Sequence, residues 1–293
     1  MDLMSQDTAV IIAGPGASPD IAMTSLRGRH GRADAGTELV RLRDAHPGPL
    51  LVEPFSALDL PAIAEHADGV VVGAAWMQDY QLLRAVARTG RPVVVQRAPA
   101  ATLDEWLSAA EYCVAEGNHE VVLCETGSRT HLPHPTIDLS LVREAGRRWP
   151  VLVDVSAEPA LALAALSAGA RGLLLGEDAT AEQVAEARAK AALLAPLLDE
   201  DAPATVAGAR AAIDRIDAAL ATLFERRAEL AGVVQRLKPV GGFAGRDLDR
   251  ERQIVETMAA RAPRLGADRI ARIMSAVIEA GLHASEEHDL SPA

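Results

Sequence analysis

Seven short apolar runs between residue 8 and about residue 198 constrain the fold more than any other feature of this sequence. They are rich in β-branched residues, contain no polar interruption, and are bounded by Gly, Pro or charged residues. Parallel strands that are buried on both faces have this composition. The runs occupy residues 9–13, 50–52, 70–72, 93–95, 121–124, 151–153 and 173–175.

Helix-like segments separate these runs, at about residues 57–67, 77–89, 102–117, 138–148, 158–168 and 180–197. Regular alternation of strands and helices predicts a parallel α/β layer or barrel. A doubtful eighth strand near residues 21–27 would complete a (β/α)8 barrel, a fold that typically takes about 250 residues. We therefore predict a trimmed TIM-like barrel in residues 1–198.

Composition and charge narrow the class of protein. Hydrophobic residues make up 49% of the chain and aromatic residues 3%, so the core must be aliphatic. The net charge of −12 argues against a general nucleic-acid surface, and an anionic substrate would need a local basic pocket. Cys113 and Cys124 do not indicate a disulfide framework. With no signal peptide or membrane span expected, we predict a cytoplasmic protein.

The pattern changes after an acidic, Pro-containing stretch, which we predict to be a linker at residues 199–205. Residues 206–238 contain no Pro and carry apolar residues at spacings of three and four, which indicates a helix about 50 Å long. Two further helices are expected from about residue 247 and from 267 to 287. Because two short helices cannot cover so long an apolar stripe, residues 206–293 are predicted to form a homodimer.

Seven charged residues lie along this helical region: Arg210, Arg227, Lys238, Arg246, Asp247, Arg250 and Glu251. Arg227 and Lys238 are eleven residues apart and point the same way, whereas Arg210 is rotated about 100° from them. Asp247, Arg250 and Glu251 share one face of the second helix. Arg246 is expected to face solvent. The charges form either a solvated helix surface or a site for a doubly anionic substrate, and the register of Arg227 and Lys238 favours the site.

Residues 210–217, 226–231, Lys238 and 246–252 resemble the all-helical class of chorismate mutase. The resemblance implies an intertwined dimer of three-helix chains that rearranges chorismate to prephenate without metal or cofactor. In that family pattern Arg227 binds one carboxylate and Arg210 from the partner chain binds the other. Lys238 reaches the ether oxygen, whose growing negative charge the site must stabilise.

The same resemblance assigns the remaining positions. Asp247 and Glu251 would hold the hydroxyl end of the substrate, and Arg250 would support the site. The family's second donor to the ether oxygen, a Gln or Glu on the third helix, is Ser285 here. Because serine is shorter, we expect weak to moderate activity, with Ser285 among the catalytic positions.

The barrel region resembles the smaller type of DAHP synthase through residues 11–15, 69–78, 102–106, 110–118 and 122–127. That family uses Cys, His, Glu and Asp to bind a metal ion, but three of the matching positions are Gly16, Ala157 and Gly176. Two phosphoenolpyruvate-binding positions are Ala75 and Gln96. We therefore predict a degenerate, non-catalytic barrel that supports dimerisation or the mutase helices, binds an effector, or docks onto another shikimate-pathway enzyme.

Three functions remain open from the sequence. The first is a chorismate mutase with an inactive synthase-like domain. The second is a regulatory or scaffold protein without useful activity. The third is a mutase or lyase acting on 4-amino-4-deoxychorismate or isochorismate. The intact Arg210, Arg227 and Lys238 favour the first and third functions over the second, and Ser285 keeps the third open.

Overall fold

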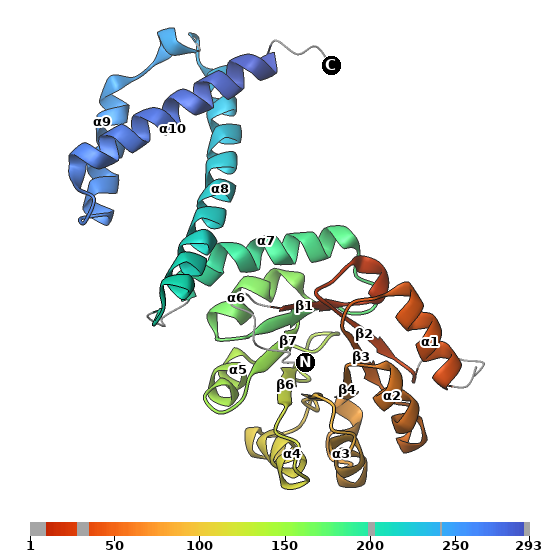
Figure 1. Ribbon diagram of the computed structural model, residues 1–293. Coiled ribbons are helices and arrows are strands. Elements are labelled where there is room, and N and C mark those ends of the chain that lie inside the picture. The colour runs from red at the N-terminus through yellow and green to blue at the C-terminus, as the bar shows by residue number, and fades with distance from the viewer. Residues whose placement is uncertain (1–9, 28–34, 199–202, 241, 290–293) are drawn as a thin grey trace. The chain divides into compact units, whose positions relative to one another are not determined.

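The computed structural model describes residues 10–27, 35–198, 203–240 and 242–289 of the 293-residue chain. The chain divides into two compact units, Met1–Ala202 and Pro203–Ala293 (Figure 1). Residues 199–202 of the predicted linker lie outside the described residues.

The first unit is a closed barrel of eight parallel strands, in which each strand pairs with its neighbours in sequence and β1 pairs with β8 (Figure 1). The predicted eight-stranded barrel is thereby confirmed. The strand that the sequence left doubtful is β2, which pairs Ile21 with Ile12 of β1 and Met23 with Leu51 of β3. The strands are β1 (Val10–Ala13), β2 (Ile21–Ser25), β3 (Leu50–Glu53), β4 (Gly69–Val72), β5 (Val93–Gln96), β6 (Val121–Glu125), β7 (Val151–Asp154) and β8 (Gly172–Leu174).

Side chains alternate along each strand between two buried clusters. One cluster fills the barrel and includes Val94, Cys124 and Leu152. The other lies between the strands and the surrounding helices and includes Val93 and Val95. Because both faces are buried, the strands need apolar residues at every position, which explains the unbroken runs in the sequence.

Within the described residues, seven α-helices surround the barrel: α1 (Ala35–Ala45), α2 (Leu60–His66), α3 (Tyr80–Ala87), α4 (Leu103–Ala115), α5 (Leu139–Gly146), α6 (Ala162–Ser167) and α7 (Ala181–Leu198). The last six lie within or close to the predicted segments. The sequence did not indicate α1, because only Leu39 and Leu42 of its eleven residues are buried. So sparse an apolar face gives a weak periodic signal.

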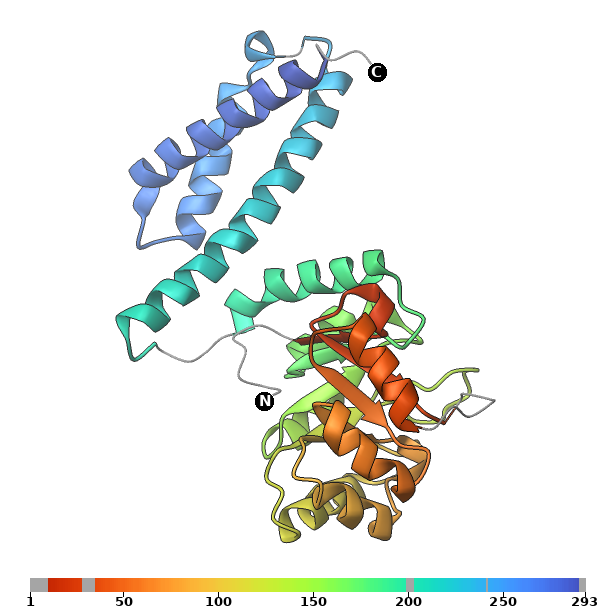
Figure 2. The ribbon, with the colours of Figure 1, turned by 45° about the vertical axis from the view of Figure 1, so that its right-hand side comes forward.

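The second unit consists of α8 (Val206–Leu237), α9 (Leu248–Arg261) and α10 (Gly266–Asp289), with a short 3-10 turn, η5 (Phe243–Gly245), before α9. Helix α10 packs against both α8 and α9 (Figure 2). Much of the apolar stripe of α8 is open in the single chain, with Ile213, Leu223 and Leu237 exposed at 55%, 50% and 80%. Among the described residues, no helix is both long enough and apolar enough to cross a membrane.

Candidate active site

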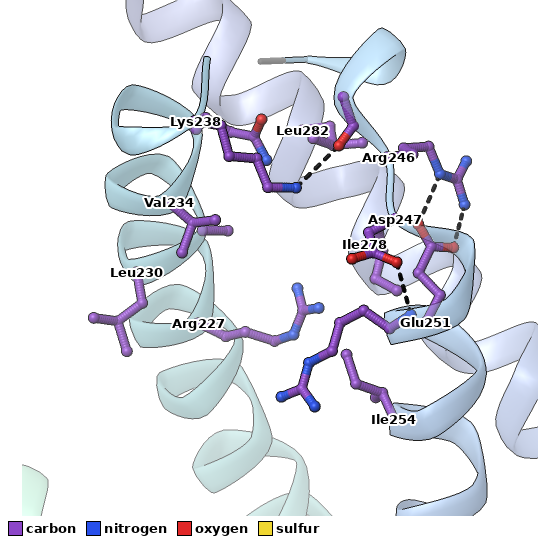
Figure 3. A pocket seen from close by; sticks show the side chains of 14 residues that line it. Arg227, Leu230, Val234, Lys238, Arg246, Asp247, Glu251, Ile254, Ile278 and Leu282 are labelled. Carbon is purple, nitrogen blue, oxygen red and sulfur yellow. Dashed lines mark hydrogen bonds and ion pairs between the residues drawn. The ribbon is translucent and has the colours of Figure 1, made fainter. Parts of the chain in front are cut away.

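A pocket of about 290 Å³ lies among the three helices of the second unit (Figure 3). Its apolar wall is formed by Leu230, Ala231, Val234, Ile254, Ile278 and Leu282. Its charged lining is formed by Arg227, Lys238, Arg246, Asp247, Arg250 and Glu251. Four cations and two carboxylates give this lining a positive charge in a chain whose net charge is −12. The pocket therefore has the local basic character that an anionic ligand requires.

Helix α8 contributes Arg227 and Lys238, which project from one side of the helix toward α9 (Figure 3). Lys238 caps the C-terminus of the helix, and its Nζ donates to the carbonyl oxygen of Gly245 at 2.9 Å. The hydrogen bond of Arg227 is longer, from Nη1 to the Val277 carbonyl oxygen at 3.4 Å. The eleven-residue spacing thus places both cations in one pocket, as the sequence predicts, and Arg227 is held less firmly than Lys238.

The first turn of α9 contributes Asp247, Arg250 and Glu251. Asp247 is the N-cap, and its Oδ1 accepts a hydrogen bond from the Arg250 backbone nitrogen at 2.9 Å. This bond satisfies one of the free N–H groups at the helix start and fixes the register of the following residues. The three predicted α9 residues therefore line the pocket together.

The prediction that Arg246 faces solvent is wrong. Its side chain is 23% exposed and forms a two-pronged ion pair with Glu251, with Nε–Oε1 and Nη2–Oε2 distances of 2.9 and 2.7 Å. Its Nη1 also approaches Oε1 of Glu279 on α10 at 3.5 Å. Arg246 precedes the N-cap in extended backbone, φ −62° and ψ 137°, so the periodicity of α9 does not determine where it points.

Electrostatics favour the ionised form of Glu251. Its pKa is lowered mainly by the hydrogen bond from Arg246, and the positive charges of Arg246 and Lys238 lower it further. Burial of the carboxyl group and the nearby charge of Asp247 oppose this effect. Glu251 is therefore suited to accept hydrogen bonds as a carboxylate.

Two predicted site residues do not line this pocket. Arg210 is exposed near the start of α8, about 25 Å along the helix axis from Arg227. Ser285 is half-buried on α10 beside α8, where its Oγ would lie 3.9 Å from a Cβ atom placed on Gly232. Sequence reasoning missed Gln235, which also lines the pocket. Its position three residues before Lys238, on the same helix face, was the available signal.

The carboxyl ends of the barrel strands carry a second group of charged residues. Arg97 and Glu125 follow β5 and end β6, and their side chains are 1% and 0% exposed. Arg97 Nη2 donates to Glu125 Oε1 at 2.7 Å and to Ser128 Oγ at 2.8 Å, and a further bond joins Nε to Oε2. These two residues form a buried ion pair.

Glu53, at the end of β3, is similarly engaged. Its Oε1 accepts from Arg27 Nε at 3.0 Å and its Oε2 accepts from Ser25 Oγ at 2.6 Å. The Arg27 guanidinium also lies 4.0 Å from the centre of the Trp76 ring, a cation–π geometry. Arg27 and Arg97 at this end of the barrel are thus both committed to internal partners.

The donor groups at the barrel mouth do not fit a metal ion. The three positions that match family ligands, Gly16, Ala157 and Gly176, have no side-chain donor. In the described part of the chain, no group of three or more His, Cys, Asp or Glu residues is arranged to hold a metal. Cys124 lies inside the barrel, where burial raises the pKa of its thiol well above the usual value. A thiol must lose its proton to bind a metal, so burial makes Cys124 a poor donor.

Two family models match this chain, and the boundary between the two matches lies near the boundary between the two structural units. Residues 24–206 match the DAHP synthetase I family, and residues 209–285 match chorismate mutase type II. The chain therefore belongs to the DAHP synthetase I family and carries a chorismate mutase type II domain after the barrel. The pocket of the second unit lies within this mutase domain.

The curated proteins that are similar to this chain bear the names of two aldolases. Phospho-2-dehydro-3-deoxyheptonate aldolase of Thermotoga maritima is 32% identical over 165 residues, which are 52% of this chain and 48% of that protein. The 2-dehydro-3-deoxyphosphooctonate aldolase of Hahella chejuensis is 27% identical over 37% of this chain and 39% of its own length. The chain thus spans about half the length, or less, of these curated relatives. The solved DAHP synthase structure of Thermotoga maritima has a TM-score of 0.61 at 26% identity, covering 68% of this chain and 73% of that one.

Proposed function

We propose that the helical domain converts chorismate to prephenate and that the barrel is not catalytic. The observation that carries this proposal is the pocket in which Arg227, Lys238 and the α9 carboxylates meet over an apolar wall. Chorismate is a dianion with an apolar ring, and its rearrangement needs no nucleophile and no proton transfer. The site has only to hold a compact conformer and stabilise charge developing on the ether oxygen.

Each charged group has a role in this proposal. Arg227 binds one carboxylate, since within the described residues its guanidinium makes a single long hydrogen bond, to the Val277 carbonyl oxygen. Lys238 donates to the ether oxygen after exchanging or sharing its bond with the Gly245 carbonyl. Asp247 and Glu251 hold the hydroxyl end, and Arg250 supports them.

Arg210 of the partner subunit supplies the second carboxylate contact in a homodimer. Arg210 is too far from Arg227 to serve its own pocket, and the exposed apolar residues of α8 supply a surface for a second copy. A long helix with an open apolar stripe gains stability when an identical helix covers it. The two pockets of the dimer are then each built from both chains.

The barrel is proposed to serve as a structural or regulatory domain. Among the residues that the structure describes, no group of acidic, His or Cys side chains at its mouth fits a metal, and Arg27 and Arg97 are engaged by carboxylates. Purified protein supplied with manganese, phosphoenolpyruvate and erythrose 4-phosphate should give no condensation product. Robust product formation would show that this part of the proposal is wrong.

The central test is a substrate panel with product identification, containing chorismate, isochorismate and 4-amino-4-deoxychorismate. Prephenate should form from chorismate, and Arg227→Ala should reduce kcat/KM by at least about 100-fold. Arg226→Ala is the matched control, because Arg226 is 67% exposed and pairs with Glu229, three residues further along α8. Turnover of isochorismate or 4-amino-4-deoxychorismate without turnover of chorismate would favour a mutase or lyase acting on that substrate. The observation that motivates this alternative is the position of Ser285 outside the pocket. If none of the three substrates is converted, the proposed enzyme activity is wrong and the regulatory or scaffold role is the remaining candidate.

A further inference from the structure

The turn between α8 and α9 ends in Arg246, whose side chain connects three parts of the mutase domain. We propose that Arg246 is a positioning residue, which holds the Glu251 carboxylate where it can accept a hydrogen bond from the substrate's hydroxyl group. This inference rests on the proposed function, and it assigns to Arg246 a role that the motif alone does not.

The geometry of the ion pair is specific. Both oxygens of Glu251 are bound by one guanidinium, at 2.9 Å and 2.7 Å, so the carboxylate plane is fixed as well as its position (Figure 3). A carboxylate has about four lone-pair sites, of which Arg246 occupies one on each oxygen. Among the described residues no other side chain is hydrogen-bonded to Glu251, so its remaining sites can accept a hydroxyl donor from the pocket. The pair is about one-fifth exposed on each side, so solvent weakens it less than a pair at the surface.

The third guanidinium nitrogen of Arg246 approaches α10. Nη1 lies 3.5 Å from Oε1 of Glu279, and the same oxygen accepts from Ser275 Oγ at 3.3 Å. Arg246 therefore couples the first turn of α9 to α10, the helix that supplies part of the apolar wall. Because its guanidinium faces two carboxylates, it is a poor candidate for direct binding of the substrate's own carboxylates.

The backbone that carries Arg246 is anchored to the other side of the pocket. The preceding residue, Gly245, offers its carbonyl oxygen to Lys238 Nζ at 2.9 Å. A Cβ atom on Gly245 would lie 2.1 Å from the Val240 carbonyl oxygen, so only glycine permits this close turn. One short segment thus positions Lys238 through a carbonyl group and Glu251 through the Arg246 side chain.

The charges around Glu251 come from several elements. Lys238 of α8 and Arg246 of the turn are positive, and Asp247 at the start of α9 is negative. Glu279 of α10 faces the guanidinium of Arg246, and Arg227 and Arg250 line the same pocket as Glu251. Arg246 makes the largest single contribution to the lowered pKa of Glu251. Removing Arg246 should therefore raise this pKa, and the carboxylate form needed by the hydroxyl group should disappear at a higher pH.

The test compares Arg246→Gln and Arg246→Lys with the wild type by measuring kcat and KM for chorismate across the acid range. Arg246→Gln should lower kcat/KM on the order of tenfold, the usual effect of losing a hydrogen bond to a charged group, and shift its acid limb to higher pH. Arg246→Lys should keep the acid limb near its wild-type position and recover part of the rate. Arg252→Ala is the matched control, since Arg252 adjoins Glu251 but is 75% exposed.

Three results would overturn the inference. They are an unchanged rate in Arg246→Gln, a lower rate with an unshifted acid limb, and a failure of Arg246→Lys to restore the profile. Far-UV circular dichroism of each variant at each pH shows whether the helices remain folded.

A measurement without substrate separates this inference from the proposed function. The carboxyl carbon-13 signal of Glu251, assigned with Glu251→Gln, is titrated in the wild type and in Arg246→Gln. The midpoint should be higher in the variant, and equal midpoints would refute the coupling. If the wild type converts none of the panel substrates, the proposed function fails and the positioning role fails with it, whereas a shifted midpoint would still establish the ion pair.

Discussion

The buried pair of Arg97 and Glu125 allows a quantitative test of whether the charged residues at the barrel mouth are structural. We consider Arg97→Met, which removes the cation and keeps a side chain of similar length. Arg97 Nη1 also donates to the carbonyl oxygens of Ala98 and Ala101, both at 3.1 Å, so the substitution removes contacts to the following loop as well.

The expected loss of stability follows from what remains around Glu125. Leaving one member of a buried ion pair unpaired costs about 3–5 kcal/mol. Glu125 Oε1 keeps hydrogen bonds from the backbone nitrogens of Gly127, at 2.9 Å, and Asp138, at 3.3 Å, which offset part of this cost. We therefore expect about 3 kcal/mol, which for a domain of this size corresponds to a decrease in Tm of about 6–12 °C.

The assay is thermal unfolding of the full chain by differential scanning calorimetry, with mutase activity measured well below the transition. Arg88→Met is the matched control, because the Arg88 side chain is 67% exposed in its pair with Glu116 and should change stability by no more than about 0.5 kcal/mol. The double variant Arg97→Met/Glu125→Leu should be more stable than Arg97→Met, since no unpaired charge remains. If Arg97→Met shifts the Tm no more than Arg88→Met does, the reasoning is refuted.

Three further predictions concern the shared site, the ether-oxygen donor and pH. When the Arg210→Ala and Arg227→Ala proteins are unfolded, mixed and refolded, about half of the dimers should contain one chain of each kind, and each such dimer has one intact pocket. Activity should therefore return to about a quarter of the wild-type value, and no recovery would contradict pockets built from two chains. Ser285→Gln should raise kcat for chorismate by about tenfold or more if it supplies the missing donor, and a fall in steady-state turnover would mean that α10 is organised differently. Burial raises the pKa of Asp154, so its ionised form destabilises the barrel at neutral pH and this cost disappears as pH falls through the raised pKa. Asp154→Asn should therefore raise the Tm at pH 7, with a gain that shrinks on acidification; a constant gain in calorimetry would argue against this titration.

Sequence patterns predicted most of the barrel but were uncertain at its N-terminal side. Strand β2 includes Thr24 and Ser25, and α1 is largely polar, so neither has the apolar signal of the other elements. Their places become clear only when the barrel closes and β2 pairs with β1 and β3. Ring closure therefore identified a strand that composition alone left in doubt.

In the candidate site, too, the sequence predicted the positions of some residues correctly and of others wrongly. Arg227 and Lys238 were placed together correctly because Arg227 lies in α8 and Lys238 is the C-cap of the same helix, whose repeating geometry sets the direction of both. Arg246 was placed wrongly because it lies in the turn before α9, where no repeat applies. Its partners are Glu251, five residues away, and Glu279, thirty-three residues away on α10.

The sequence by itself determined the alternation of strands and helices from β3 onward, the division into barrel and helical domain, and the register of cations along α8. These features depend on local periodicity, which every segment carries in its own residues. Only the tertiary structure decided that Arg246 binds Glu251, that Arg97 is buried against Glu125, and that Ser285 lies beside Gly232 and outside the pocket. Such contacts join residues from different elements, so they depend on turn geometry and packing, for which a single segment has no signal.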